Sequence, residues 1–308
     1  MQDLTRHHSL AFGFAWNSDV ALPAFSADPG NSGRPALEIV RREVVPQHRE
    51  PIRAQGNVVQ YAEGLRYHAD REATFDLYTP GRVEVTPGPD WTGTLPPSFF
   101  GTLTAFLLAG RGCIPLHGSA VEIEGRAVLI CGPAGAGKST LAAGLIALGA
   151  RLISDDLSIL HPVIPGQQPM LFAGRRAIRL FSSTAEWLAE SATLVGEATP
   201  ARGKLAVLPT QVDPLTPVPL SSVVVLGSED HRSTGPERQL LLKKQLYRPH
   251  WMRLLPGRDL RLLALSFAAR QLAVYRQPSI TGRQRETFLA QAERTWRKVT
   301  SPVAIDIQ

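Results

Sequence analysis

Short apolar stretches alternate with turn-forming residues along the first third of the chain. Residues 57–61 and 82–85 alternate apolar and polar side chains, a pattern typical of strands with one buried face. Proline and glycine pairs, such as the one at 80–81, mark turns between such segments. We therefore expect residues 1–96 to form a small β-rich N-terminal domain.

The pattern changes after the two prolines at 96–97. Residues 98–108 have the period of a helix, and apolar strand-like and helical segments alternate from there to about residue 160. Such alternation is typical of an α/β core. We assign residues 97–308 to this second domain.

Further strands and helices are predicted in the C-terminal half. Strands are expected at 177–181 and 222–226, with the polar, proline-bearing stretch 198–219 between them as a long loop. Residues 260–274 and 281–299 have helical periodicity. The C-terminal part is therefore expected to be mainly helical.

Composition limits the kind of protein that these elements can build. The 308 residues are 44% hydrophobic and 19% charged, which predicts a folded chain of one large or two ordinary domains. No apolar run reaches the roughly 18 residues of a membrane-spanning helix, and the N-terminus lacks the charged region and cleavage site of a signal peptide. We expect a cytoplasmic protein without a membrane partner.

Charge and cysteine content exclude further classes. The net charge of +6 comes from arginines spread along the chain, without a basic block that has interleaved aromatic residues. Nucleic acid is therefore a disfavoured partner. The two cysteines are too few for a disulfide framework or a thiolate metal site, so both are expected to be small core residues.

The segment CGPAGAGKST at 131–140 contains the phosphate-binding pattern G-x-x-x-x-G-K-[ST]. The apolar run 127–130 predicts a strand entering it, and residues 141–148 predict a helix leaving it. Glycines let successive backbone N–H groups turn around a polyphosphate, and the helix N-terminus adds positive charge. A glycine-rich turn without ligand is the alternative. The residues expected to bind ATP are Gly132, Pro133, Ala134, Gly135, Ala136, Gly137, Lys138, Ser139 and Thr140.

Phosphoryl transfer also needs a carboxylate that holds a metal or takes a proton. Asp155 and Asp156 follow the predicted strand 151–154, whose C-terminal end would lie beside the loop in an open α/β sheet. An ordinary turn or a helix cap is the alternative for two adjacent acids. Their position after this strand favours a catalytic role.

Five other polar positions are candidates. His117 opens the predicted strand 120–123, although a lone histidine is more often structural than catalytic. Arg179 and Lys204 lie in or next to apolar runs, and either could neutralise charge on a transferring phosphoryl group. Arg175 and Arg176 are weaker candidates of the same kind, and solvated surface charge is the alternative for all four cations.

The span from His117 to Leu160 resembles the catalytic domain of bacterial HPr kinase/phosphorylase. The resemblance rests on a His-Gly pair, the phosphate-binding loop and the Asp-Asp pair, which occur in the same order. It implies a P-loop core of the HPr-kinase/PEP-carboxykinase type, with Lys138 on the phosphates, Ser139 and Asp155 on Mg²⁺, and His117 in the active site. It implies that one of the two aspartates is the general base, and Asp156 matches the family's acid/base residue.

The chain also departs from that family. The family's glycine-rich signature after the aspartates, which supplies a further metal-binding glutamate, has no counterpart in residues 172–179. The N-terminal domain is also unlike theirs. Both departures argue against HPr itself as the substrate.

The chain resembles more closely the HPr-kinase-related proteins encoded beside peptide-modification genes, including kinases of lasso-peptide precursors. The shared features are the entry segment 111–117, the GKST loop, the Ser-Asp-Asp strand end at 154–156 and the later pair Gly203-Lys204. The resemblance implies an ATP- and Mg²⁺-dependent kinase acting on a serine hydroxyl of a peptide or on a small hydroxyl-bearing substrate. Related kinases assemble as oligomers, so a homo-oligomer is a further expectation that no motif demonstrates.

Other functions remain as alternatives. One is a nucleotide-dependent switch or ATPase whose N-terminal domain binds a partner, and others are a kinase of HPr or of free serine. A nucleotide-dependent carboxykinase would need metal ligands that we do not find in the sequence.

Overall fold

The computed structural model describes residues 5–30, 32–48, 50–78, 81–188, 193–199, 203–227, 229–280 and 285–301, of which 193–199 are described by their backbone only. The chain has a mixed α/β fold and divides into two compact units. Unit 1 comprises Met1–Cys113 and Arg248–Arg258, and unit 2 comprises Ile114–Tyr247 and Asp259–Gln308. The domain boundary expected between residues 96 and 97 stays a prediction.

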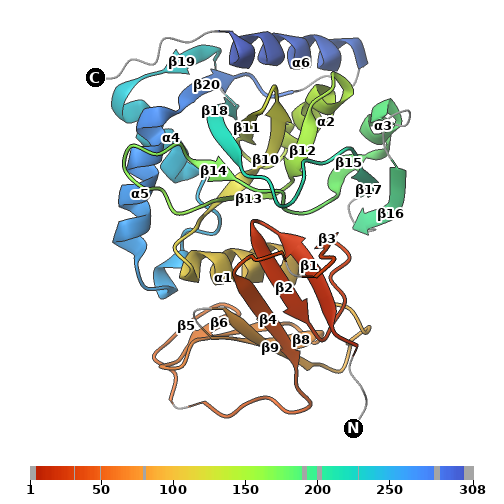
Figure 1. The fold of residues 1–308 in the computed structure, drawn as a ribbon, viewed down its shortest axis with the longest axis vertical. Coiled ribbons are helices and arrows are strands. Elements are labelled where there is room, and N and C mark those ends of the chain that lie inside the picture. Colours follow the sequence, from red (N-terminus) through yellow and green to blue (C-terminus); the bar gives the residue numbers. More distant parts are fainter. Residues whose placement is uncertain are drawn as a thin grey trace. The chain divides into compact units, whose positions relative to one another are not determined.

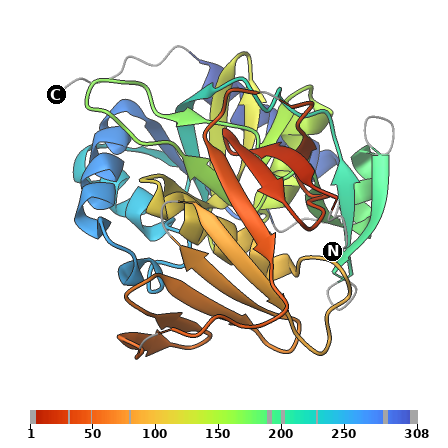
Figure 2. The ribbon, with the colours of Figure 1, turned by 60° about the horizontal axis from the view of Figure 1, so that its bottom comes forward.

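Unit 1 contains one nine-stranded sheet in the order β3-β1-β2-β4-β9-β8-β7-β6-β5 (Figure 2). The pairs β2–β4 and β4–β9 are parallel, whereas the other neighbours are antiparallel. The predicted strands 57–61 and 82–85 are both present. The bounds are β1 His7–Ala11, β2 Phe14–Ser18, β3 Ser26–Ala27, β4 Ala36–Arg41, β5 Arg53–Gln55, β6 Val58–Gln60, β7 Leu65–Ala69, β8 Ala73–Tyr78 and β9 Arg82–Pro87.

Aromatic side chains join this sheet to the helical segment η1 (Phe99–Leu103) and α1 (Thr104–Gly110). The ring centroids of Phe75 and Phe99 lie 5.9 Å apart, and those of Trp16 and Phe99 lie 6.3 Å apart. Burying such large rings is among the strongest stabilising contributions that a small core can make. The helix predicted at 98–108 is therefore present and forms part of the core of unit 1.

Unit 2 is built on a sheet in which β10 and β11 are central (Figure 1). β10 pairs antiparallel with both β11 and β12, whereas β11 runs parallel to β18 and β18 runs parallel to β20. β19 pairs with β20 at the edge. The bounds are β10 Ile114–Ile123, β11 Arg126–Cys131, β12 Arg151–Ser154, β13 Leu157–Leu160, β14 Met170–Leu171, β18 Val218–Leu226, β19 His231–Ser233 and β20 Ala273–Gln277.

The long strands β10 and β18 each take part in two sets of pairings. Residues 114–117 of β10 pair with β13, and residues 118–123 pair with β11. β13 continues through β14 to the start of β18, so the path β11-β10-β13-β14-β18 returns to β11. The change of partner within β10 falls between His117 and Gly118, where a Cβ on Gly118 would lie 2.6 Å from the carbonyl oxygen of Ile130.

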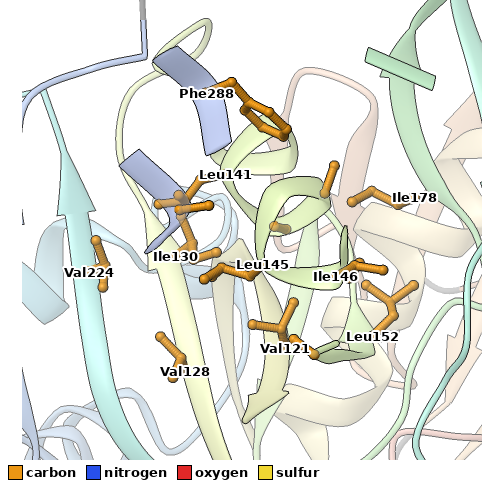
Figure 3. Close-up of a cluster of buried hydrophobic side chains, with 14 of the residues drawn as sticks. Val121, Val128, Ile130, Leu141, Leu145, Ile146, Leu152, Ile178, Val224 and Phe288 are labelled. Atoms are coloured by element: carbon orange, nitrogen blue, oxygen red, sulfur yellow. The ribbon is translucent and has the colours of Figure 1, made fainter. Parts of the chain in front are cut away.

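Helices cover the two faces of this sheet. Helices α2 (Lys138–Ala147) and α6 (Arg285–Thr300) pack on the face that carries Val128 and Ile130, as the cluster in Figure 3 shows. Helices α4 (Gly235–Lys244) and α5 (Arg258–Gln271) contribute to the cluster that contains Leu129. Strand residues alternate between faces, so the continuous apolar run 127–130 is explained by burial on both sides. In the described part of the chain, no helix has the length and apolar character needed to cross a bilayer.

Two expectations about elements are wrong. The loop predicted at 198–219 contains β17 (Lys204–Leu208), the middle strand of a three-stranded sheet with β15 (Ile178–Phe181) and β16 (Thr193–Thr199). The helix predicted to reach residue 274 ends at Gln271, and β20 begins at Ala273. β17 lies within a polar, proline-bearing stretch, and β20 begins two residues after α5 ends, so neither short apolar segment stands out from its surroundings. The remaining short segments are α3 Ser182–Ala185, η2 Glu186–Leu188 and η4 Met252–Leu254.

Candidate active site

The glycine-rich loop joins the end of β11 to the start of α2, as the sequence predicts. Gly137 precedes the helix with φ +94°, and Gly132 and Gly135 have φ +139° and +80°. These conformations are costly for residues with a Cβ. A Cβ on Gly132 would also lie 2.8 Å from the carbonyl oxygen of Leu226. The loop geometry therefore depends on its glycines for both backbone angles and close packing.

A segment from the far end of the sequence holds the loop on its other side. The backbone N–H of Ile280, just after β20, donates a 3.1 Å hydrogen bond to the carbonyl oxygen of Ala136. A Cβ on Gly137 would lie 2.8 Å from Cβ of Ile280. The loop is thus packed between Leu226 at the end of β18 and Ile280.

Lys138 lies over this loop. Its Nζ donates hydrogen bonds of 3.0 Å to the carbonyl oxygens of Gly132 and Pro133. Burial lowers the pKa of the Lys138 ammonium below its ordinary value, while Asp156 and Asp155 act in the opposite direction. The side chain is therefore a half-buried cation at the position where the loop can cradle phosphates.

Asp155 is the buried acid of the site, with only 3% of its surface exposed. Its Oδ1 accepts hydrogen bonds from the hydroxyls of Ser139 at 2.8 Å and Ser119 at 2.6 Å. Its Oδ2 accepts a 3.0 Å hydrogen bond from the backbone N–H of Arg179. Burying a carboxylate costs free energy unless it is well hydrogen-bonded. These three hydrogen bonds offset that cost for Asp155.

Asp156 has a different environment from its neighbour. It adopts φ +71°, an uncommon conformation for a residue with a Cβ, and its side chain is 32% exposed. One carboxylate oxygen lies 3.1 Å from the Arg179 guanidinium, and the other lies 3.6 Å from Nδ1 of His117. Strained backbone conformations concentrate at functional sites. Asp156 is therefore the carboxylate of the pair that an incoming group can reach.

His117 contacts Asp156 from the middle of β10. Its Nδ1 lies 3.1 Å from the main-chain oxygen of Asp156, and its ring centroid lies 5.9 Å from that of Tyr247. Burial and the positive charge of Lys138 lower the pKa of His117, and the Asp156 charge only partly opposes them. The lowered pKa favours the neutral imidazole at pH 7, and because a carbonyl oxygen can only accept a hydrogen bond, Nδ1 is the nitrogen that donates to Asp156.

The strand order explains why the two aspartates reach the loop. β11 and β12 are both antiparallel to β10, so they run in the same direction and end at the same edge of the sheet. β10 lies between them in the sheet. Since residues two apart on a strand share a face, β10 presents His117 and Ser119 together toward the aspartates.

Ser119 is a site residue that the sequence analysis misses. Its hydroxyl is fully buried and bonds to Asp155. The signal that could have found it is its spacing of two from His117 on a predicted strand. Serine is too common in strands for that spacing to be persuasive without the pairing.

The predicted cations differ in how closely they join the site. Arg179 contacts both aspartates, through its backbone N–H and its guanidinium. Arg175 is largely buried, and its pKa is lowered by burial and by the charge of Arg179. Its Nε has no hydrogen-bond partner among the described residues. Lys204 instead lies 5.1 Å over the ring of Phe181, and Arg176 is exposed. The structure therefore brings Arg175 closer to the site than its low rank in the sequence analysis suggests.

The oxygen atoms beside the loop fit a magnesium ion. Mg²⁺ prefers hard oxygen ligands and is usually held by one or two protein side chains together with waters and substrate phosphates. The Ser139 hydroxyl and the Asp155 carboxylate, 2.8 Å apart, supply such a pair next to the phosphate-binding loop. Among the described residues, no group of three or more His, Cys, Asp and Glu could hold a metal, and this mode of binding does not need one.

Comparisons with known proteins point to one family for part of the chain. No family model matches the sequence. An HPr kinase/phosphorylase of Lactobacillus acidophilus is 40% identical over 84 residues, covering 25% of this chain and 26% of that protein. A protein of the same name from Pediococcus pentosaceus is 49% identical over 72 residues, or 22% of each chain. This chain thus spans about a quarter of the length of the curated relatives that it matches.

One solved structure is also similar in part. The HPr(Ser) kinase/phosphatase of Coxiella burnetii matches with 12% identity and a TM-score of 0.29, covering 60% of this chain and 98% of that one. The two curated matches support an HPr-kinase-like family for the segment of the chain that they cover.

Proposed function

We propose that this protein is an ATP- and Mg²⁺-dependent kinase that transfers the γ-phosphoryl group to a serine hydroxyl of a peptide. The observation that carries the proposal is the difference in burial and contacts between two adjacent carboxylates. Asp155 is buried and bonded to the loop residue Ser139, whereas Asp156 is partly exposed and lies beside His117 and Arg179. Protein kinases use one carboxylate near the metal and another near the attacking hydroxyl.

Asp155 and Ser139 would hold the metal in this proposal. A magnesium ion held by these two residues would supply positive charge that offsets the negative charge developing on the phosphates. Ser119 and the backbone N–H of Arg179 fix the Asp155 carboxylate, so its orientation is set before a nucleotide binds. Lys138 and the loop N–H groups would bind the phosphates from the other side.

Asp156 would act as the general base. It accepts the proton of the acceptor hydroxyl while the hydroxyl oxygen forms a bond to the γ-phosphorus. The bond between that phosphorus and the bridging oxygen breaks, and ADP leaves with the electron pair. His117 is neutral, so it can hold Asp156 through its main-chain oxygen without neutralising the carboxylate.

Two arginines would stabilise the transferring group. Arg179 lies against Asp156, and the largely buried Arg175 has an Nε without a hydrogen-bond partner among the described residues. A cation in a site with little water lowers the energy of developing negative charge more than it would in bulk solvent. Lys204, paired with the Phe181 ring, is a more distant contributor.

The acceptor follows from the resemblance to lasso-peptide precursor kinases, so we propose the C-terminal serine of such a peptide. The curated relatives are named for HPr, which makes HPr the first competing acceptor, and free serine is the second.

Intact mass spectrometry tests these acceptors. A serine-terminated precursor peptide, its C-terminal alanine version, HPr and free serine are each incubated with the protein and Mg-ATP. We expect one phosphoryl group on the serine-terminated peptide only. Phosphate release with every acceptor unchanged would contradict the kinase proposal and favour a nucleotide-dependent switch.

A further inference from the structure

A polar cavity lies in unit 2, at the edge of the sheet opposite to the loop. It has a volume of about 310 Å³ and is lined by residues from β11, β18, β19, α4 and the ends of α5 and α6. Three of its lining residues are Arg126, Arg232 and Arg238, and two others are Ser221 and Ser222. The described lining residues include no aspartate or glutamate.

The cavity is separate from the candidate active site. Arg126 is the first residue of β11, and the loop begins after its last residue, Cys131. At about 3.3 Å per strand residue, this places Arg126 roughly 17 Å from the start of the loop. The parallel strands β11, β18 and β20 thus have the loop at their carboxyl ends and this cavity toward their amino ends.

Within the described part of the chain, ion pairing does not account for the charge of two of these three arginines. Among the described residues, neither Arg126 nor Arg238 forms a salt bridge, and Arg238 makes a single 3.4 Å hydrogen bond to the carbonyl oxygen of Leu272. Nearby carboxylates are engaged by other cations, since Glu237 pairs with Arg276 and Asp230 pairs with Lys298. Glu124 is an exposed acid that lines an adjoining cavity of about 150 Å³, but not this one.

We propose that this cavity binds a small organic anion that carries two or more phosphate or carboxylate groups. A guanidinium presents several N–H donors in a plane, and it binds both kinds of group through paired hydrogen bonds. Several arginines within one cavity suit a ligand with more than one ionised group, and the serine hydroxyls supply further donors. The volume matches a small metabolite and lies at the lower end of the range for ligand pockets.

Isothermal titration calorimetry with pyrophosphate and with citrate tests the proposal without any turnover. We expect one equivalent of at least one probe to bind the full-length protein, and R126E and R238Q each to raise its Kd by at least about tenfold. R294E changes the same charge on an exposed residue of α6 and should leave the Kd unchanged. Binding of pyrophosphate alone would identify a phosphate ligand, and binding of citrate alone a polycarboxylate.

The active-site loop is the competing location for either probe, and K138A separates the two. Binding in the cavity survives K138A, whereas loss of binding in K138A with normal binding in R126E would overturn the proposal. Equal weakening by R126E and R294E would show a general charge effect and would also overturn it, as would a Kd above about 10 mM for both probes. Thermal melting identifies any variant that fails to fold, and R126Q then replaces R126E.

Discussion

The hydroxyl of Ser139 donates a 2.8 Å hydrogen bond to Oδ1 of Asp155, although 16 residues separate the two in the sequence. This contact joins the first turn of α2 to the residue that follows β12. The same carboxylate oxygen accepts a hydrogen bond from Ser119 on β10. Residues from three elements therefore meet at one buried oxygen. Substitutions around this oxygen test the roles of the neighbouring residues.

Asp156→Asn should abolish phosphoryl transfer while leaving nucleotide affinity largely intact. The amide keeps the size of the side chain but cannot accept the hydroxyl proton, and general bases contribute about 10²- to 10⁴-fold to rate. The measurements are kcat with the peptide acceptor and the Kd for ATP. Asp259→Asn, an exposed position at the start of α5, is the matched control. Equal activity in the two variants would remove Asp156 from the mechanism.

Lys138→Ala should weaken both nucleotide binding and transfer. The ammonium is half-buried beside the loop carbonyls, and a charge-assisted contact to phosphate of this kind is worth at least about tenfold in affinity. Titration with a fluorescent ATP analogue measures the change. Lys244→Ala removes an exposed lysine at the end of α4 and should have no effect. Unchanged affinity in Lys138→Ala would contradict phosphate binding by the loop.

Ser139→Ala should raise the Mg²⁺ concentration needed for half-maximal activity. The variant loses the hydroxyl that we assign to the metal, and it also removes a hydrogen bond from Asp155. Ser139→Thr keeps a hydroxyl at this position and should restore a magnesium dependence close to that of the natural protein. The dependence of rate on Mg²⁺ at saturating ATP separates the variants. If serine, threonine and alanine gave the same curve, the residue would not be a metal ligand.

Protonation of His117 should make the folded protein less stable in mild acid. Its pKa is lowered in the folded state, chiefly by burial, so the unfolded chain binds the proton more tightly. The stability that this residue contributes is present above its ordinary value of 6.5 and is lost as the pH falls through the folded pKa. The melting temperature should therefore fall less between pH 7.5 and pH 5 in His117→Gln than in the natural protein. His250→Gln, an exposed histidine, should behave like the natural protein.

Gly144→Ala should destabilise the protein even though alanine favours helices. An added Cβ would lie 2.8 Å from Cβ of Ala292 and 2.9 Å from Cζ of Phe288, both on α6. Overpacking of this kind costs about 1–3 kcal/mol, more than the roughly 1 kcal/mol that alanine gains over glycine within a helix. Chemical denaturation measures the free energy of unfolding. The double variant with Ala292→Gly should lose less than the sum of the two single variants, because it removes the contact with Ala292 and leaves only the one with Phe288.

The sequence predicts the strand, loop and helix around residues 127–148 well, because each leaves a local signal. The signals are a continuous apolar run for a strand buried on both faces, glycines for the loop angles, and the start of helical periodicity. The sequence also placed the aspartates beside the loop, but it did not show that β10 lies between β11 and β12. Ser119 and the backbone N–H of Arg179 could not be identified locally, because strand pairing and folding of distant segments bring them to Asp155. The strands β17 and β20 were missed because a polar, proline-bearing stretch surrounds the first and helix α5 directly precedes the second.

The hydrogen bond from Ile280 to Ala136 also bears on the order in which the protein folds during its synthesis. A ribosome synthesises the glycine-rich segment more than 140 residues before it adds the residue that packs against Gly137. Contacts between such distant segments form late, because closing a long stretch of chain costs entropy before the contact offsets it. A nascent chain that ends before β20 therefore contains the complete phosphate-binding motif but lacks the residue that packs against its loop. Chains that stop before this point should bind nucleotide poorly, so that nucleotide affinity reports on completion of the fold.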